Sequence, residues 1–395
     1  MSSVDSDPFF SLSNSSSTWN ACIGPQGEET NYIEGYIEAA LLLCETLMAN
    51  WLLMQRDTLA MPILYNGRHA IELILKYTAK NLSRLNLARE YSTLNHDILA
   101  IWQHLHEANV PDKEIRQCLC KLEIYVKSMA QIDNDGQEFR YAETRDGQQS
   151  LQNNPILDIE NVKNHLIVIK EIIKKILSRL NDLEDEIRTG IYTNRASRKD
   201  LLEIAEILGN QSTWNDADFI NKKQSIMENF GLSSRAFSAA VNKIKSSRDL
   251  SVLIGTEGRF IHLLNEDIHR FIGEWHIWHP NHRETPGLGN SITVSQIDVA
   301  SFIERAQITY LICERTASWL TSEKMADLHA LFDIGRSNLF MDLYDARVAS
   351  AMREYNSTSS VLEGIRYLLE KTNLLSCLQN SCRKLGKFAL ADELT

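Results

Sequence analysis

Apolar residues recur every three or four positions along most of this chain, which is the spacing that gathers them on one face of an α-helix. In the first half the pattern predicts helices over residues 31–56, 62–87, 96–109, 111–132 and 162–187. In the second half it predicts short helices beginning near residues 199, 216 and 233, and longer ones over 251–277, 297–320, 322–355 and 360–395. Glycine (17) and proline (7) are too scarce for folds that need many tight turns. We therefore expect an all-α protein.

The helix predicted over 162–187 carries the most regular apolar stripe in the chain. Its apolar positions alternate in steps of four and three, and they are Val162, Leu166, Ile169, Ile173, Ile176, Leu180, Leu183 and Ile187. A stripe of this length is long enough for another helix to pack along it. Two interpretations remain open: the stripe packs against helices of its own chain, or it is the seam of a homodimer.

Composition divides the chain into three predicted parts. Residues 1–30 are rich in serine and in acidic residues, and we expect them to be disordered. Residues 31–190 form a first helical bundle, which Gly190 ends. The polar stretch YTNRASRKD then leads into a C-terminal helical domain over 191–395.

Several features favour a cytoplasmic protein that does not cross a membrane. The N-terminus has neither the basic start nor the apolar run of a signal peptide. The most apolar run, 37–54, contains Glu38, Glu45 and Asn50, which make it too polar to span a bilayer. The seven cysteines, an odd number without paired spacing, indicate reduced thiols. A net charge of −11 argues against a general polyanion binder but leaves room for a local basic site.

One predicted helix carries a row of charged side chains. Arg68, Glu72 and Lys76 are four residues apart and so share a helical face, which His69 adjoins. This row is either a chain of ion pairs on a solvated face or part of a functional cluster that His96 joins, together with an arginine from the long polar segment that follows. A histidine beside a carboxylate and several cations can act as general acid or base while the cations hold a phosphate.

The same residues lie in strings that resemble a known superfamily. The strings are DTLAMPILYNGRHAIELILKYTAK, LNHDILAIWQHL and FRYAETRDG, with ADLHALFDIGRSNLFMDLYD around Gly335 and Arg336 in the second half. They resemble a group of bacterial helical proteins of the HEPN superfamily, and the resemblance covers roughly 32–187 plus the later patch. Members of that superfamily are nucleotide-binding or ribonuclease bundles common in toxin–antitoxin and anti-phage systems.

The resemblance implies a HEPN-like bundle in an antiviral defence or toxin-type system, binding RNA or a nucleotide or acting as a metal-independent endoribonuclease. Together with the helical spacing of the charged row, it leads us to expect catalysis from His96, Arg140, Arg68 and His69, and ligand binding from Glu72, Lys76 and Tyr141. It implies neither a metal nor another cofactor, and it implies a homodimer or a protein partner in a defence complex. A second function class stays open, namely a non-catalytic module that dimerises or holds a partner.

The HEPN ribonuclease signature is an arginine followed, after four to six residues, by a histidine. Arg89 with His96, and Arg270 with His276, have this spacing. About two such pairs are expected by chance in a chain of this composition, so spacing alone has little weight. The residue after the arginine is usually Asn, Asp or His in that signature, whereas here Glu90 and Phe271 occupy the position. The chain therefore departs from the catalytic pattern.

The stretch RFIGEWHIWHPNHRETPG is the most concentrated group of histidines. Three interpretations are open: a zinc site of His276, His279 and His282, a phosphate site that uses Arg270 and Arg283, or a helix end packed through its two tryptophans. A zinc site would need the chain to fold back after the proline, and it lacks acidic or cysteine companions in a recognised spacing. We favour the packed helix end.

The stretch KQSIMENFGLSSRAFSAAVN has the form of a helix-turn-helix. A glycine occupies the turn, and the positions expected to point inward are Ile226, Phe230, Leu232 and Phe237. The basic residues that flank it are Lys222, Lys243, Lys245 and Arg248. Any two helices joined by Gly-Leu-Ser would show the same pattern, so DNA binding remains an alternative at this point.

Overall fold

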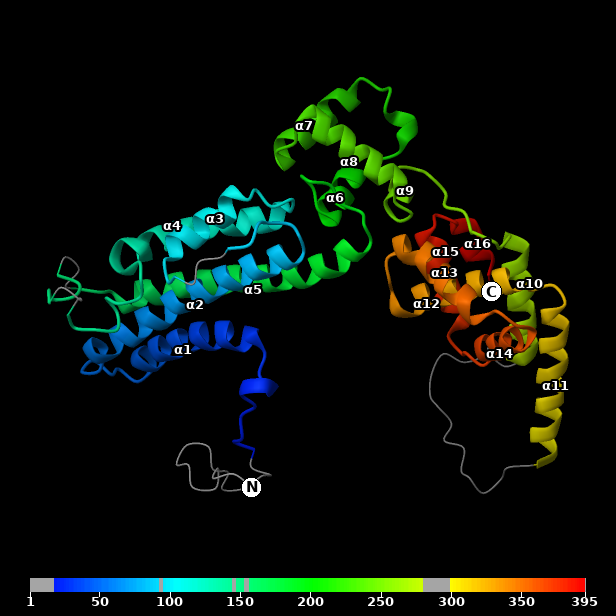
Figure 1. Ribbon diagram of the computed structural model, residues 1–395, viewed down its shortest axis with the longest axis horizontal. Helices are drawn as coiled ribbons and strands as arrows, with labels where there is room; N and C mark the ends of the chain where they lie inside the picture. Colours follow the sequence, from blue (N-terminus) through cyan, green and yellow to red (C-terminus); the bar gives the residue numbers. More distant parts are fainter. Residues whose placement is uncertain (1–17, 92–94, 144–146, 153–155, 280–298, 395) are drawn as a thin grey trace. The chain divides into compact units, whose positions relative to one another are not determined.

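The computed structural model describes residues 18–91, 95–143, 147–152, 156–279 and 299–394 (Figure 1). The first five α-helices are α1 (Glu29–Ala49), α2 (Arg56–Arg84), α3 (Ile98–Glu107), α4 (Lys113–Asp133) and α5 (Ile159–Arg188). Those that follow are α6 (Arg198–Leu208), α7 (Asp218–Phe230), α8 (Ser234–Ser246), α9 (Leu250–Leu253), α10 (Asn265–Trp278), α11 (Val299–Ala317), α12 (Ser322–Ser337), α13 (Tyr344–Glu354), α14 (Thr358–Leu369), α15 (Leu374–Lys384) and α16 (Phe388–Glu393). Single 3-10 turns lie at η2 (Gly24–Gln26), η3 (Gln211–Thr213) and η5 (Met341–Leu343).

The prediction of an all-α fold is confirmed. The protein is 71% helical, and the described residues contain no β-strand beyond one isolated bridge between Glu143 and Gln149. The first 17 residues of the segment expected to be disordered lie outside the described residues. Among the helices that the structure describes, none combines the length and the apolar character needed to cross a bilayer.

The chain divides into two compact units. The first comprises Met1–Val110 and Glu114–Asp182, and the second comprises Pro111–Lys113 and Leu183–Thr395. The division therefore falls inside α5, a few residues before Gly190. Each unit has its own buried apolar side chains.

The first unit is built around α2, which lies against α1 and α3. Its buried apolar side chains come from all five helices, and they include Ile33, Ile37, Ile63, Ile71, Ile74, Leu75, Ile101, Leu105, Leu119, Leu122, Ile169 and Ile173. At Gly67 of α2 a Cβ would lie 2.7 Å from Cδ2 of Leu166, so α5 packs closely on α2 at this point. The face of α2 that carries the charged residues lies in the same bundle and is closed by the segment that follows α4.

The apolar stripe of α5 belongs to the chain's own core. Leu166, Ile169, Ile173 and Ile176 are each 2% exposed or less within the single chain. Side chains already packed against their own bundle are not available to a second copy. Of the two interpretations, the internal one is confirmed, and the expectation that this stripe forms a homodimer seam is wrong.

The helices expected over 251–277, 322–355 and 360–395 are each divided in the structure, into α9 and α10, α12 and α13, and α14 to α16. In the first unit the sequence predicts that Pro62 opens the second helix and that Asn95 caps the third, and both predictions are wrong. Pro62 does not open α2, because that helix begins at Arg56 and continues through the proline. Pro62 is the seventh residue of α2, so it removes one hydrogen bond of the helix interior, the bond that an N–H there would donate to the carbonyl of Thr58. The cap of α3 is Asp97, whose carboxylate accepts the Ala100 N–H at 2.8 Å, whereas Asn95 accepts a bond from the hydroxyl of Tyr91.

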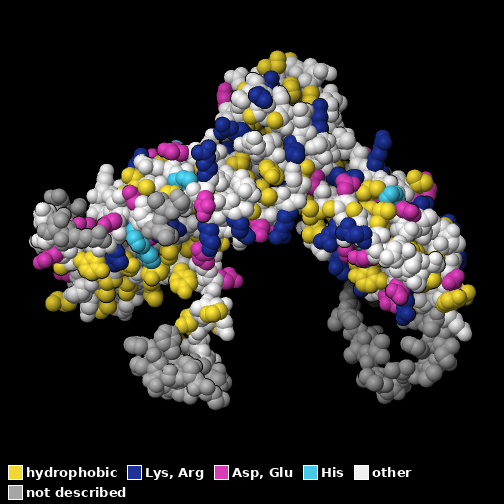
Figure 2. All heavy atoms as spheres, viewed as in Figure 1, with side chains coloured by type: hydrophobic (Ala, Val, Ile, Leu, Met, Phe, Trp, Pro, Cys, Tyr) yellow, Lys and Arg dark blue, Asp and Glu magenta, His cyan; other side chains and the backbone are white. Residues whose placement is uncertain are grey.

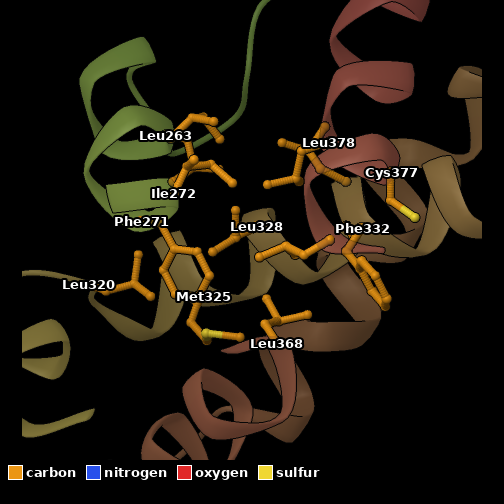
Figure 3. Close-up of a cluster of buried hydrophobic side chains, with 14 of the residues drawn as sticks. Leu263, Phe271, Ile272, Leu320, Met325, Leu328, Phe332, Leu368, Cys377 and Leu378 are labelled. Carbon is orange, nitrogen blue, oxygen red and sulfur yellow. The ribbon is translucent and has the colours of Figure 1, made fainter. Parts of the chain in front are cut away.

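The second unit contains two apolar clusters. The smaller one joins α6, α7, α8 and α9. The larger one joins α10 to α16 around α12, and Figure 3 shows Leu328 and Phe332 of α12 among side chains from the surrounding helices. Asp327, also on α12, is fully buried and accepts the backbone N–H groups of Ile261, His262 and Leu263. These bonds fix the segment that leads into α10.

A buried arginine connects the two clusters of the second unit. Arg198 of α6 donates to Asp249 at 2.5 Å and to Asp342 at 2.9 Å, and its guanidinium lies 3.9 Å from the ring centre of Phe340. Burial, with the neighbouring Asp342 carboxylate, raises the pKa of Asp249 to about 6. Two acidic side chains thus share one cation, and together they attach α6 to η5.

Candidate functional site

Glu72 is the centre of a polar cluster in the first unit. Its carboxylate is 2% exposed and accepts hydrogen bonds from Nη1 of Arg68 at 2.8 Å and from Nζ of Lys76 at 2.7 Å. Nδ1 of His96 lies 2.7 Å from Oε1, and Nδ1 of His69 lies 3.8 Å from Oε2. The i, i+3 and i, i+4 spacings on α2 bring four of these five side chains together, and the residue before the α3 cap supplies the fifth, His96.

The Glu72 carboxylate is ionised in this setting. Burial raises the pKa of such a group, but the hydrogen bonds from His69, Lys76, Arg68 and His96 outweigh burial and hold the pKa of Glu72 well below its ordinary value. An ionised carboxylate only accepts hydrogen bonds, so Nδ1 of His96 carries the proton in this contact. Glu72 therefore fixes both the orientation of the His96 ring and its tautomer.

Arg68 lies beneath this cluster and has no access to solvent. It is 1% exposed, and besides Glu72 its guanidinium donates to the backbone carbonyls of Asp133, Asn134 and His96, each at 2.7 Å. These bonds tie α2 to the end of α4 and to the residue before the α3 cap. Arg68 is thus placed to position His96 rather than to touch a ligand, which differs from the catalytic role that the sequence resemblance implies for it.

The segment after α4 covers the cluster. The Asp133 carboxylate accepts the backbone N–H groups of Glu138 and Phe139 at 3.0 and 3.4 Å, so the segment turns back over α2. At Gly136 a Cβ would lie 3.1 Å from Nη1 of Arg68 and 3.5 Å from Nη2 of Arg140. The two guanidinium groups therefore approach the same point of the turn, one from below and one from the surface.

Arg140 and Tyr141 lie at the exposed rim of the cluster. Nε of Arg140 donates to the carbonyl of Gly136, and its guanidinium lies 5.7 Å from the ring centre of Tyr65 and 5.6 Å from that of Tyr141. Tyr141 is 55% exposed. This rim presents a cation and an aromatic face to solvent, which is a combination suited to a phosphate and a base.

His69 is held between two tyrosines. Its ring stacks on Tyr65 at 5.5 Å and meets Tyr36 edge-on at 4.4 Å. His96 differs, because its side chain is 56% exposed and only Nδ1 is engaged with Glu72. The structure therefore brings together the six charged or histidine residues proposed from the sequence, but with different exposure: His96 and Arg140 reach solvent, Lys76 and His69 do so in part, and Arg68 and Glu72 do not.

Sequence reasoning missed Asp133, Tyr36 and Tyr65. Tyr65 lies four residues before His69 on α2, so helical spacing could have placed their rings together. Asp133 ends α4 immediately before Asn-Asp-Gly, which is a sequence typical of a tight turn after a helix. Tyr36 comes from α1, and its contact with His69 depends on how α1 and α2 pack, for which the sequence offers no local signal.

In the two arginine–histidine pairs with HEPN spacing, the arginines are Arg89 and Arg270, and each lies beside a residue outside its pair. The carbonyl of Arg89 lies 3.0 Å from Nε2 of His104, and both residues line a pocket of about 640 Å³ beside α3. Arg270 lies with its guanidinium 4.4 Å from the ring centre of Trp319. Each arginine is thus placed beside a residue that the signature does not include.

The histidine-rich stretch forms a packed helix end. Trp275 is fully buried and donates to the carbonyl of Lys371 at 2.9 Å, and Nε2 of His279 lies 2.9 Å from the carbonyl of Leu369. His282 and Arg283 lie outside the described residues. Within the part of the chain that the structure describes, no group of three or more His, Cys, Asp or Glu side chains is arranged to hold a metal ion.

Comparisons with known proteins return no match: no protein-family model, no curated protein and no solved structure is similar to this chain.

Proposed function

We propose that the Glu72–His96 pair, with Lys76 and Arg140, forms a phosphate-binding site that acts on RNA, as the HEPN resemblance implies. The observation that carries the proposal is the buried, ionised carboxylate that holds Nδ1 of a half-exposed histidine. A carboxylate in this position fixes the histidine for proton transfer through its other ring nitrogen, Nε2. A purely structural ion-pair network would not require that histidine to reach solvent.

The chemistry that fits this arrangement is metal-independent cleavage of a phosphodiester. Nε2 of neutral His96 takes the proton from the ribose 2′-hydroxyl, and the 2′-oxygen attacks the adjacent phosphorus. The bond from phosphorus to the 5′-oxygen breaks, which leaves a 2′,3′-cyclic phosphate, and the 5′-oxygen takes a proton from water in the open site. The carboxylate of Glu72 stabilises the imidazolium formed on His96.

Two cations lie where they can stabilise the charged phosphoryl group. Lys76 Nζ and His96 Nδ1 are bonded to the same carboxylate oxygen, so they are within two hydrogen-bond lengths of one another. Arg140 is exposed and approaches the cluster from the Gly136 turn. Charge stabilisation by such donors is effective when they are fixed before the substrate binds, which the contacts to Glu72 and Gly136 provide.

We expect His96→Ala to reduce RNA cleavage at least about a hundredfold, because general acid–base catalysis contributes at least this much. Cleavage would be followed on a labelled single-stranded RNA in the presence of a chelator, with the cyclic phosphate identified at the new 3′ end. His106→Ala is the matched control, since His106 is an exposed histidine on the same helix, α3, outside the cluster. Thermal unfolding should be nearly unchanged in both variants.

Two results would contradict this proposal. One is that His106→Ala reduces RNA cleavage as much as His96→Ala does. The other is the absence of both cleavage and RNA binding in the wild-type protein under conditions where it is folded.

A second function, association of two copies of this chain, has support from the surface of α1. Figure 2 shows hydrophobic side chains gathered along the lower edge of the first unit. The exposed large hydrophobic residues on α1 and the turn after it are Tyr32, Leu42, Met48, Trp51, Leu53 and Met54. Trp51 is 80% exposed and Met54 is 88% exposed. Exposed apolar side chains gathered in this way are typical of an interface, and we propose that a second copy covers them.

Replacing Trp51 with Asn and Met54 with Gln should convert a dimer to a monomer. Asparagine suits position 51, where the backbone is left-handed with φ of 51°. Light scattering after gel filtration at tens of micromolar measures the change. Ile220→Gln, at a residue 70% exposed on α7, is the control and should leave the dimer intact. A wild-type protein that is monomeric under these conditions would overturn this second function.

A further inference from the structure

A second candidate site lies in the second unit, on the small cluster of helices α6 to α9. Helices α7 and α8 are separated by only three residues, Gly231, Leu232 and Ser233, and Gly231 has a left-handed backbone with φ of 65°. The Ser233 side chain caps α8 by accepting the N–H of Ala236 at 3.2 Å. The chain thus makes one abrupt turn between two regular helices of 13 residues each.

The inward face of this helix pair is apolar and closed. Both helices pack on α6, and the residues they bury with the turn are Ile226, Phe230, Leu232, Phe237, Ala240 and Ile244, each 5% exposed or less. A three-helix core with a tight turn between its second and third helices is the framework of the helix-turn-helix. In that framework the third helix is presented to a partner by the other two.

The outward face of α8 is polar, and its side chains are mostly small. Its exposed residues are Ser234, Arg235, Ser238, Ala239, Asn242, Lys245 and Ser246. Small side chains allow the helix axis to come close to a partner surface, while Arg235 and Asn242 extend from it. Arginine and asparagine are the side chains that make bidentate hydrogen bonds to guanine and adenine, respectively.

The charge of this face is opposite to that of the whole protein. From Ser233 to Ser246 the chain has three Lys or Arg residues and no Asp or Glu, although the net charge of the protein is −11, whereas Arg248 beyond α8 is paired with Asp345. Figure 2 shows Lys and Arg side chains over the part of the surface formed by α7 and α8, near the top of the view. Within the described residues, Arg235 has no ion-pair partner. Such a local basic face suits a polyanion that meets the protein at this place alone.

We infer that α8 binds the major groove of duplex DNA, with α7 and its lysines against the phosphate backbone. The helix is about 20 Å long and about 10–12 Å wide with its side chains. The major groove of B-form DNA is about 12 Å wide and admits such a helix, whereas the deep, narrow major groove of duplex RNA does not. Arg235, Ser238 and Asn242 face the bases, and Lys245 and Lys222 face phosphates.

The proposal is tested with the full-length protein and a library of random DNA duplexes of about 20 base pairs, which spans two helical turns. Selection should enrich one sequence. Fluorescence anisotropy should then show that Arg235→Ala weakens binding to the enriched duplex about tenfold or more and reduces the preference over a scrambled duplex. Lys245→Ala should weaken binding to both duplexes equally and reduce the dependence on salt.

Matched controls separate this site from a general effect of charge and from the RNA site. Arg347→Ala removes an exposed arginine from α13 in the same unit and should leave DNA binding unchanged. His96→Ala should also bind the enriched duplex as the wild type does. The proposal is overturned if no sequence is enriched, if Arg347→Ala weakens binding as much as Arg235→Ala, or if Arg235→Ala weakens binding of duplex RNA of the same length as much as binding of the DNA.

Discussion

Replacing Glu72 with glutamine should destabilise the first unit by about 3–5 kcal/mol, which is the usual cost of removing one partner from a buried ion pair. The guanidinium of Arg68 is 1% exposed, so it would lose the nearer of its two counter-charges without gaining water and would keep only Asp133, at 3.7 Å. A loss of this size is a large part of the free energy of unfolding of an ordinary domain. Hydrogen exchange measured peptide by peptide would show the loss in α2, in α3 and at the end of α4.

The matched control is Glu123→Gln on α4. Both glutamates pair with a lysine four residues later, Glu72 with Lys76 and Glu123 with Lys127, but the Glu123 pair lies at the surface. The control should leave exchange in the first unit nearly unchanged. Equal effects of the two substitutions would show that Glu72 contributes no more than a surface ion pair.

Because of Glu72, the free energy of unfolding of the first unit should decrease in acid. Hydrogen bonds overcome burial and lower the pKa of this carboxyl in the folded state, so its contribution is complete above its ordinary value of 4.5 and is lost as the pH falls below that value. Asp249 in the second unit has the opposite sign, because burial raises its pKa to about 6. Its contribution is complete below its ordinary value of 3.8 and is lost as the pH rises through about 6.

The sequence predicted the cluster around Glu72 only in part. Helical spacing places Arg68, Glu72 and Lys76 on one face, but the same spacing describes a solvated row of ion pairs equally well. What distinguishes the two is the path of the segment after α4, which turns on Asp133 and covers Arg68. That segment has no periodicity, so its path depends on contacts with residues far away in the sequence.

Periodicity was more informative about the existence of helices than about their partners. The stripe of α5 is regular enough for a coiled coil, yet Leu166 packs closely on Gly67 of α2 in the same chain. A glycine in the middle of a helix is unfavourable in isolation, and here it makes room for the leucine. Such complementarity between two distant residues has no signature in the heptad pattern itself. The turn between α7 and α8, in contrast, was predicted from Gly231 and its apolar neighbours, because every signal there is local.

Gly335 is a second glycine that allows close contact between residues far apart in the sequence. It lies in the later of the two regions that resemble the HEPN superfamily. It lies on α12, where that helix packs against α15. A Cβ at this position would lie 1.9 Å from the carbonyl oxygen of Cys377. One turn earlier, the carbonyl of Leu331 accepts a hydrogen bond at 2.6 Å from the buried hydroxyl of Ser381. Figure 3 shows Phe332 of α12 and Cys377 of α15 in the larger apolar cluster of the second unit.

Gly335→Ala should therefore destabilise the second unit by about 3 kcal/mol or more, because two helix backbones must separate to admit one methyl group. Gly273→Ala is the control: this glycine lies inside α10, where a Cβ would meet nothing within 4 Å. Alanine is the better helix former at both positions, so the control should gain about 0.5–1 kcal/mol. The substitutions are chemically identical, and the opposite signs expected in thermal unfolding isolate the contact with Cys377. If Gly335→Ala stabilised the protein as the control does, α12 and α15 could not approach as closely as the structure places them.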